Sequence, residues 1–102
     1  MRMWGVDPNK LCNQHLLGEH VEMHMFAGTI KNDISIQGYV EKGLVNPRLI
    51  TERHTVLAKE MVKRGMNHKS PLEFNSGQLP ENMIAIKKNE RELRKRCKNC
   101  LV

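Results

Sequence analysis

Apolar residues recur every three or four positions through the first third of the chain, which is the period of an amphipathic helix. Asp7 can cap the start of this helix, and Pro8 can occupy its first position, where the missing N–H costs nothing. The pattern continues to about Ala27, after which Gly28 supplies a C-terminal exit. We therefore predict a long first helix that begins at Pro8.

A second, short helix is also marked by a capping residue. It is predicted from Ser35, its cap, to Glu41 or Lys42, and Gly43 closes it.

The next helix has the clearest start and stop signals in the sequence. Asn46 caps it, Pro47 begins it and Gly65 ends it, while Lys63 and Arg64 suit the negative end of the helix dipole. Its interior carries three apolar residues at helical spacing, namely Ile50, Leu57 and Met61.

The rest of the chain predicts a loop and a last helix. Residues 66–79 are rich in Pro, Gly, Asn and Ser and are expected to form a loop. The last helix is predicted to start near Pro80 and to carry Met83, Ile84 and Ile86. No useful length shows the alternation of a strand. A chain of 102 residues is a single domain on length. The prediction is an all-α fold: a small bundle of three main helices plus a short helix, with an extended N-terminal segment packed near the first helix.

Composition restricts the class of protein. With 39% hydrophobic residues the chain can bury a modest core, but it contains no apolar run of about 18 residues that could span a membrane. A signal region is not expected, because Asp7, Pro8, Asn9 and Lys10 interrupt the N-terminal stretch. Three cysteines, an odd number, favour reduced thiols over a disulfide framework. We expect an intracellular (cytoplasmic) protein with no membrane partner.

Positive charge is concentrated near the C-terminus. Residues 87–98 (KKNERELRKRCK) hold seven basic and two acidic groups, which is +5 of the net +6. Such a run can be only a solvated helix face. Together with a pI near 9.5, however, it favours a polyanionic partner, and nucleic acid is the first candidate.

The first helix places polar groups among apolar ones. At helical spacing, Leu11, His15, Glu22 and Phe26 fall within about 60° of arc, with Glu19 beside them. Two apolar stripes flank this line. One contains Cys12, Leu16, Met23 and Ala27, and the other Leu17, Val21 and Met25. His15 and Glu22 either form a structural pair or line an active site near the chain's amino terminus.

A set of residues in fixed order bears on that choice. Gln14-His15-Leu16 is followed by Glu19, Glu22, Phe26 and Gly28, and further matches are Arg2, Lys63-Arg64-Gly65 and Ile84-Ala85-Ile86. In this order the sequence resembles the phage pyrimidine-dimer DNA glycosylases, small all-α enzymes also called endonuclease V of the DenV type. The similarity spans most of the chain and is thin between residues 30 and 45.

The resemblance implies a mechanism. The family uses its N-terminal α-amine as nucleophile and a glutamate of the first long helix as the catalytic carboxylate, which here implies Met1 and Glu22. An α-amine titrates at about 7.7–8.0, so it is neutral at pH 7 far more often than a lysine. It would attack C1′ of a deoxyribose, form a Schiff base and cut the strand by β-elimination, with His15 positioning the sugar or orienting Glu22. No metal or other cofactor is required.

The resemblance also implies the partner, double-stranded DNA with a pyrimidine dimer or an abasic site, bound by a monomer. Val21 and Met25 stand where the phage enzyme has arginines. Other cations are therefore expected to hold the substrate: Arg2, Arg48, Arg53, Arg91, Arg94, Lys87 and Lys88. The chain has only four aromatic residues for stacking on a base, and one of them, Trp4, is expected in the core.

Two other interpretations stay open. In one, residues 87–98 make a non-catalytic basic nucleic-acid-binding module and the line of Glu22 is structural. In the other, His20 and His24 join Cys97 and Cys100 in a zinc site, although the spacing evidence for it is weak. His54 and His68 are expected at the surface or at the edge of a pocket.

Overall fold

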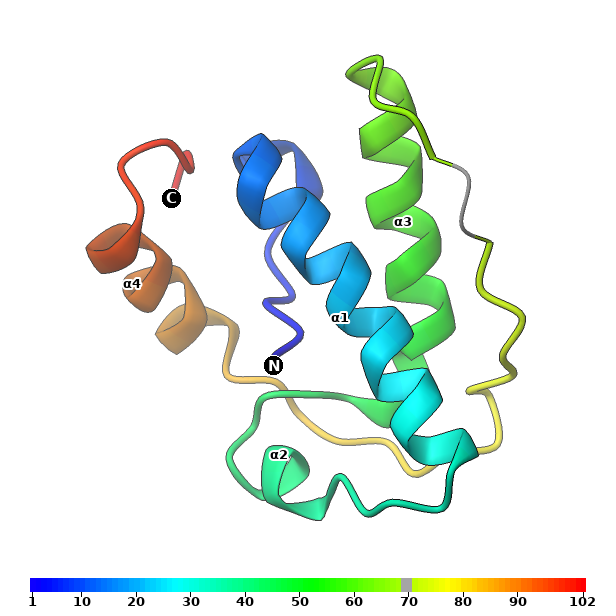
Figure 1. Cartoon of the computed structure of the whole chain (residues 1–102). Coiled ribbons are helices and arrows are strands. Elements are labelled where there is room, and N and C mark those ends of the chain that lie inside the picture. Colours follow the sequence, from blue (N-terminus) through cyan, green and yellow to red (C-terminus); the bar gives the residue numbers. More distant parts are fainter. Residues whose placement is uncertain (69–70) are drawn as a thin grey trace.

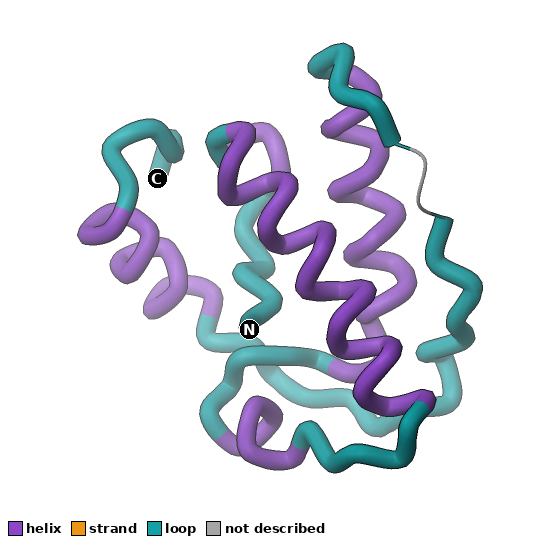
Figure 2. Tube along the Cα trace, in the orientation of Figure 1, coloured by secondary structure: helices purple, strands orange, loops and turns teal. Residues whose placement is uncertain are grey.

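The computed structural model describes residues 1–68 and 71–102, and this part of the chain is helical without any β-strand. Four α-helices follow in order: α1 (Asn13–Lys31), α2 (Gln37–Glu41), α3 (Ile50–Lys63) and α4 (Ile86–Arg96). Two 3₁₀ turns, η1 (Pro8–Lys10) and η2 (Pro47–Leu49), precede α1 and α3 (Figures 1 and 2). The predicted all-α class is confirmed. Among the described helices, none combines the length and the hydrophobicity needed to cross a membrane.

The start of the first helix differs from the prediction. Asp7 does accept a hydrogen bond from the backbone N–H of Asn9 at 3.1 Å, but the turn that it caps ends at Lys10. Leu11 then takes an extended conformation and is buried. α1 begins only after Cys12, whose sulfur accepts from the N–H of His15. Burial of Leu11 in the core therefore divides the predicted helix into two elements.

The end of α1 also lies beyond the predicted exit. Gly28 stays inside the helix, which continues to Lys31. The left-handed residue after the helix is Asp33, with φ of 57°. A short polar side chain tolerates that conformation, so the glycine was a misleading stop signal.

The signals around α2 and α3 are largely confirmed. The Ser35 hydroxyl accepts from the N–H of Gln37 at 3.1 Å ahead of α2. The Asn46 side chain accepts from the N–H of Arg48 at 3.2 Å, although the turn it starts is 3₁₀ before it becomes α-helical. Gly43 and Gly65 both have positive φ, as helix-ending glycines do.

The last helix begins later than predicted, at Ile86 in place of Pro80. The preceding segment is extended because its polar groups bond elsewhere in the fold. The amide nitrogen of Asn82 donates to the carbonyl oxygens of Val40 at 2.9 Å and Val45 at 3.1 Å. These tertiary bonds replace a helical turn over residues 80–85.

The core lies between α1 and α3 and is closed by α4 and the N-terminal segment. All three helices and this segment contribute fully buried side chains, among them Leu16, Met23, Phe26, Ile50, Leu57, Met61, Leu93, Met3 and Val6. Figure 1 shows the N-terminal segment running between α1 and α4. Its position beside α1 was predicted from the sequence, whereas its contact with α4 was not. The fold is flattened, with extents of 36 × 30 × 17 Å.

Candidate active site

The N-terminal segment is held by backbone hydrogen bonds on two sides. The N–H of Met3 donates to the carbonyl of Leu44 at 2.6 Å. On the other side, the buried Asn89 of α4 donates through its amide nitrogen to the carbonyls of Met3 at 3.3 Å and Trp4 at 2.9 Å. Met3 and Trp4 are themselves buried, Trp4 as predicted. The first residues are therefore fixed within the fold.

This segment brings the start of the chain to Glu22 of α1. The backbone N–H of Arg2 donates to Oε2 of Glu22 at 3.5 Å. Because adjacent backbone nitrogens are less than about 3.8 Å apart, the nitrogen of Met1 lies within about 7 Å of that oxygen. Met1 and Glu22 are both half-buried, so neither is sealed in the core. The two residues that the resemblance selected are thus neighbours in space.

Arg2 connects this site to α4. Its guanidinium donates to Oδ1 of Asn89 at 3.2 Å and lies 4.5 Å from the ring centroid of Trp4, a cation–π distance. Arg2 also lines a cavity of about 570 Å³ together with Lys42, Lys88 and Asn89. Glu41 and Glu92 belong to the same lining, so the three cations there outnumber the acidic groups by one.

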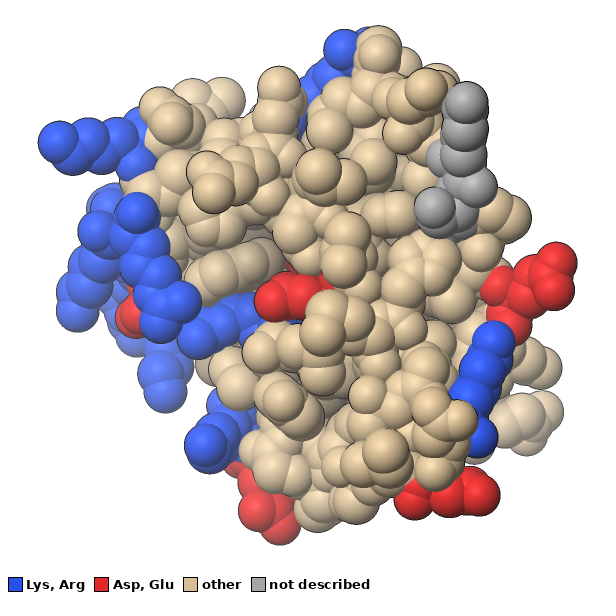
Figure 3. Space-filling model, viewed as in Figure 1, with Lys and Arg blue, Asp and Glu red and all other residues tan. Residues whose placement is uncertain are grey.

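The predicted substrate-binding residues of α4 form an exposed basic surface. Asn89 and Leu93 are the buried residues of this helix, whereas Lys87, Lys88, Arg91 and Arg94 are exposed. Figure 3 shows Lys and Arg side chains gathered over the region of α4, beside the N-terminal segment. We call Lys87, Lys88, Arg91, Arg94, Lys95 and Arg96 the α4 basic face.

Two predicted cations lie in other surroundings. Arg53 of α3 is engaged by the buried carboxylate of Glu19, with Nη2 at 3.0 Å from Oε1, and it also donates to the carbonyl of Val6 at 2.7 Å. Burial raises the pKa of Glu19, and Arg53 opposes this by stabilising the charged form. Arg48 donates to the carbonyl of Leu79 at 2.9 Å and is exposed. In this structure the guanidinium of Arg53 is therefore occupied by contacts within the protein.

His15 does not pair with Glu22. Its Nδ1 lies 3.2 Å from the sulfur of Cys12 and 3.5 Å from the sulfur of Cys100, and its ring meets Trp4 edge-on at 6.1 Å. The geometry thus places the imidazole in a cysteine cluster at the start of α1. The sequence signal for this cluster is the shared spacing of Cys12-x-x-His15 and Cys97-x-x-Cys100.

Only one of the two apolar stripes on α1 is buried. Leu16, Met23 and Ala27 lie in the core, whereas Leu17, Val21 and Met25 are 44%, 45% and 49% exposed. Glu22 therefore lies between the core and a solvent-facing apolar strip. A carboxylate in this position can meet a ligand from outside.

Four histidines gather where α1 meets α3. His20 and His54 are buried, and His54 lines a pocket together with His68, which agrees with the expected position at the edge of a pocket. Nε2 of His68 lies 2.9 Å from Nε2 of His20, and the His24 ring is 5.0 Å from that of His20. Burial lowers the pKa of His20 to about 4, with the neighbouring His54, His68 and His24 acting in the same direction. Cys97 and Cys100 cluster with Cys12 and His15, not with His20 or His24, so the zinc site considered for these two histidines is not formed.

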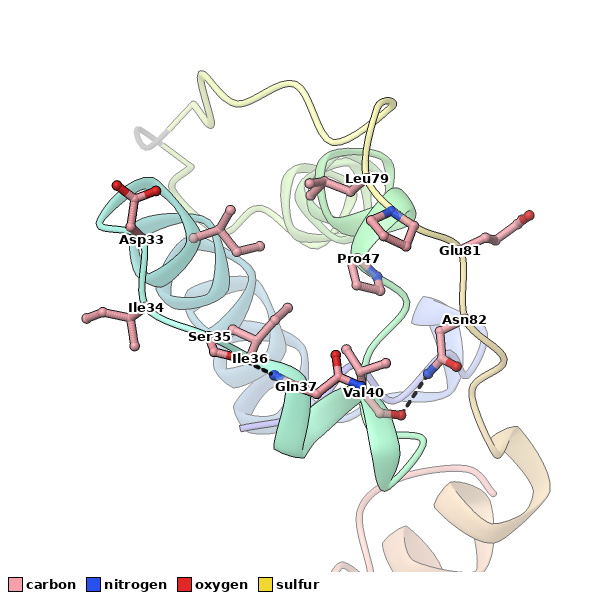
Figure 4. A pocket seen from close by; sticks show the side chains of 12 residues that line it. Asp33, Ile34, Ser35, Ile36, Gln37, Val40, Pro47, Leu79, Glu81 and Asn82 are labelled. Atoms are coloured by element: carbon pink, nitrogen blue, oxygen red, sulfur yellow. Dashed lines mark hydrogen bonds between the residues drawn. The ribbon is translucent and has the colours of Figure 1, made fainter.

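A separate apolar cavity of about 330 Å³ lies at the α2 end of the molecule. Figure 4 shows Ile36, Val40, Pro47 and Leu79 around it, with Asn82 bonded to the carbonyl of Val40. It shares no lining residue with the cavity beside Arg2, so it is not part of the site at Glu22.

The fold and site together define a basic helical domain that presents a glutamate to its own N-terminal residues. The model of the family described as pyrimidine dimer DNA glycosylase matches residues 1–74, and the chain belongs to this family. No curated protein and no solved structure gives a significant match. The matched range includes Met1, Glu22 and α1 to α3, but α4 lies outside it.

Proposed function

We propose that this protein is a DNA glycosylase and abasic-site lyase in which the α-amine of Met1 is the nucleophile and Glu22 the catalytic carboxylate. The observation that carries the proposal is the 3.5 Å contact between the Arg2 N–H and Glu22, which brings the chain start beside this acid. Family membership supplies the substrate class, DNA with a pyrimidine dimer.

The reaction needs no group beyond these two and the substrate. The neutral amine donates its lone pair to C1′ of the deoxyribose, the bond from C1′ to the base breaks, and the base leaves with the electron pair and takes up a proton. Opening of the sugar ring at C1′–O4′ leaves an iminium. Removal of a proton from C2′ then forms a C2′=C3′ double bond, and the 3′ phosphate leaves with the electrons of its C–O bond. Water finally hydrolyses the imine and frees the amine.

Glu22 has two tasks in this scheme. Its negative charge stabilises the cationic sugar and the iminium, because opposite charges attract strongly in a partly dehydrated site. Its carboxylate also accepts and returns protons during ring opening and elimination. Both tasks require it to face the amine from α1, as the Arg2 contact supports.

In this proposal, cations of Arg2 and of α4 hold the substrate. Arg2 and Lys88 line one cavity, and the α4 basic face continues from it. Contacts of this kind fix the register of a duplex and carry no sequence information, which suits an enzyme that acts on damage.

Borohydride trapping tests the proposal directly. We expect a covalent adduct with oligonucleotides that carry an abasic site or a cyclobutane dimer and none with undamaged DNA, and peptide mapping should locate the adduct on the N-terminal peptide. An adduct on a lysine would contradict the role of Met1. Salt-sensitive binding without adduct or strand cleavage would instead establish the non-catalytic basic module.

Glu22→Gln provides the second test. The amide keeps the size of the side chain but not its charge, so we expect folding and DNA binding to persist while strand cleavage falls by about a hundredfold or more. Glu73→Gln, which changes an exposed carboxylate outside the helices, is the matched control. Equal cleavage by the two variants would remove Glu22 from the mechanism.

A further inference from the structure

Two pairs of residues that are far apart in sequence meet at one end of α1. Cys12 and His15 stand at the start of this helix, and Cys97 and Cys100 follow the end of α4. One ligand atom from each of the four lies within 4.8 Å of every other. The sulfur of Cys12 is 3.2 Å from Nδ1 of His15 and 3.7 Å from the sulfur of Cys97.

These separations match the edges of a zinc tetrahedron. Zinc bonds of about 2.3 Å to sulfur and about 2.0 Å to nitrogen, at tetrahedral angles, place two sulfurs about 3.8 Å apart and a sulfur and a nitrogen about 3.5 Å apart. The Cys12–Cys97 distance of 3.7 Å and the Cys100–His15 distance of 3.5 Å agree with both values. We infer that Cys12, His15, Cys97 and Cys100 form a structural Cys₃His zinc site.

Backbone donors around the sulfurs support thiolate ligands. The N–H of Cys12 donates to the sulfur of Cys100 at 3.2 Å, that of His15 to Cys12 at 3.4 Å, and that of Asn99 to Cys97 at 3.4 Å. Cys12 is also the N-cap of α1, where the helix dipole favours negative charge. Each cysteine sulfur thus accepts an N–H bond, as the outer shell of a metal site provides.

Two alternatives to a zinc site, a disulfide bond and packed neutral thiols, explain less of this geometry. The three cysteines are free thiols, and the 3.7 Å between the sulfurs of Cys12 and Cys97 far exceeds a disulfide bond of about 2.05 Å. Thiols packed as small apolar groups would need neither an imidazole nitrogen among them nor three backbone donors.

The position of the site indicates what it does. Four protein ligands leave no open coordination position, which is the mark of a structural zinc site. It fastens residues 97–102 to the start of α1, where the N–H of Leu101 also donates to the carbonyl of Lys10 at 2.7 Å. The His15 ring packs on Trp4, whose carbonyl is held by Asn89 of α4. Zinc would therefore fix α4 and its basic face relative to the N-terminal segment.

The metal content of the purified chain tests the inference independently of DNA chemistry. After loading with zinc and gel filtration, elemental analysis should give one zinc per chain, and cobalt should give the absorption of a tetrahedral thiolate site. Cys97→Ser and His15→Ala should lose the metal, whereas Lys98→Ala, between the two C-terminal cysteines, should retain it. His15→Cys should also retain it, because a Cys₄ set binds zinc equally well.

Thiol reactivity is measured on the chain without substitutions, so this second test does not depend on whether the variants fold. Zinc should slow modification of all three cysteines on the order of tenfold or more, because coordinated thiolates react slowly, and a chelator should reverse this. Modification rates unchanged by zinc, a disulfide found by mass spectrometry, or full metal retention by both Cys97→Ser and His15→Ala would each overturn the inference.

Discussion

The buried ion pair of Glu19 and Arg53 joins three parts of the molecule, because Arg53 also bonds the carbonyl of Val6. Removing the acid in Glu19→Ala leaves the Arg53 charge buried without its partner, which typically destabilises a protein by about 3–5 kcal/mol. We expect that loss in the free energy of unfolding, measured by urea denaturation.

The exposed pair of Arg96 and Glu92 on α4 is the control for this measurement. Solvent and salt screen such pairs, so Glu92→Ala should change stability by about 0.5 kcal/mol or less. A similar loss of unfolding free energy for both substitutions would show that the Glu19 pair contributes no more to stability than an exposed pair does.

His20 makes stability depend on pH. Its pKa is lowered to about 4 in the fold, mainly by burial, whereas an unfolded histidine titrates near 6.5. Between these values the unfolded chain binds the extra proton, so stability is lost as the pH falls from about 6.5 to about 4. Thermal unfolding should show this slope, and His20→Gln should reduce it. Parallel curves for the two proteins across this range would contradict the assignment.

Single residues were predictable where their own chemistry decided their role. The pattern marked Glu22 as a carboxylate that requires a partner or a ligand, and the resemblance then selected it as the catalytic acid. His15 lay on the same line of the helix, yet its partners Cys97 and Cys100 are more than 80 positions away in the sequence. Helical periodicity gives neighbours on one helix only, so the wrong partner was assigned.

At the scale of elements, α4 positions the N-terminal segment through Asn89. In Asn89→Ala the buried carbonyls of Met3 and Trp4 lose their donor, so we expect a loss of about 2 kcal/mol in stability. The chain start also loses its fixed position, and trapping of abasic DNA should slow by about tenfold or more at saturating DNA. Asn9→Ala, an exposed asparagine, is the control. Unchanged trapping would show that α4 does not position the amine.

All of the helices could be predicted as elements, but only some of their limits could. Caps at Ser35 and Asn46 and the glycines at positions 43 and 65 act through neighbouring residues, so the sequence alone reveals them. The late start of α4 depends on bonds from Asn82 to residues about 40 positions earlier. Such competition between local and tertiary hydrogen bonds cannot be inferred from a helical pattern.

Over the whole molecule, the site is assembled from segments at both ends of the chain. The family match covers residues 1–74, while Asn89 and the α4 basic face come from the unmatched part. Charge clustering in residues 87–98 could be seen in the sequence, but its location beside Met1 required the fold. The proposed nucleophile from one end and the proposed phosphate-binding cations from the other are therefore united only by tertiary packing.

This arrangement predicts how DNA affinity responds to salt. Each phosphate contact that is lost lowers the slope of log K against log salt by about 0.9, because fewer counterions are released on binding. Lys88→Ala with Arg91→Ala should therefore reduce the slope by up to about 1.8 and weaken binding to damaged and undamaged duplexes alike. Lys59→Ala, an exposed lysine on α3, should leave the slope unchanged. If the α3 variant changed the slope and the α4 variant did not, the duplex would lie across α3, and the amine and the basic face would not act on the same strand.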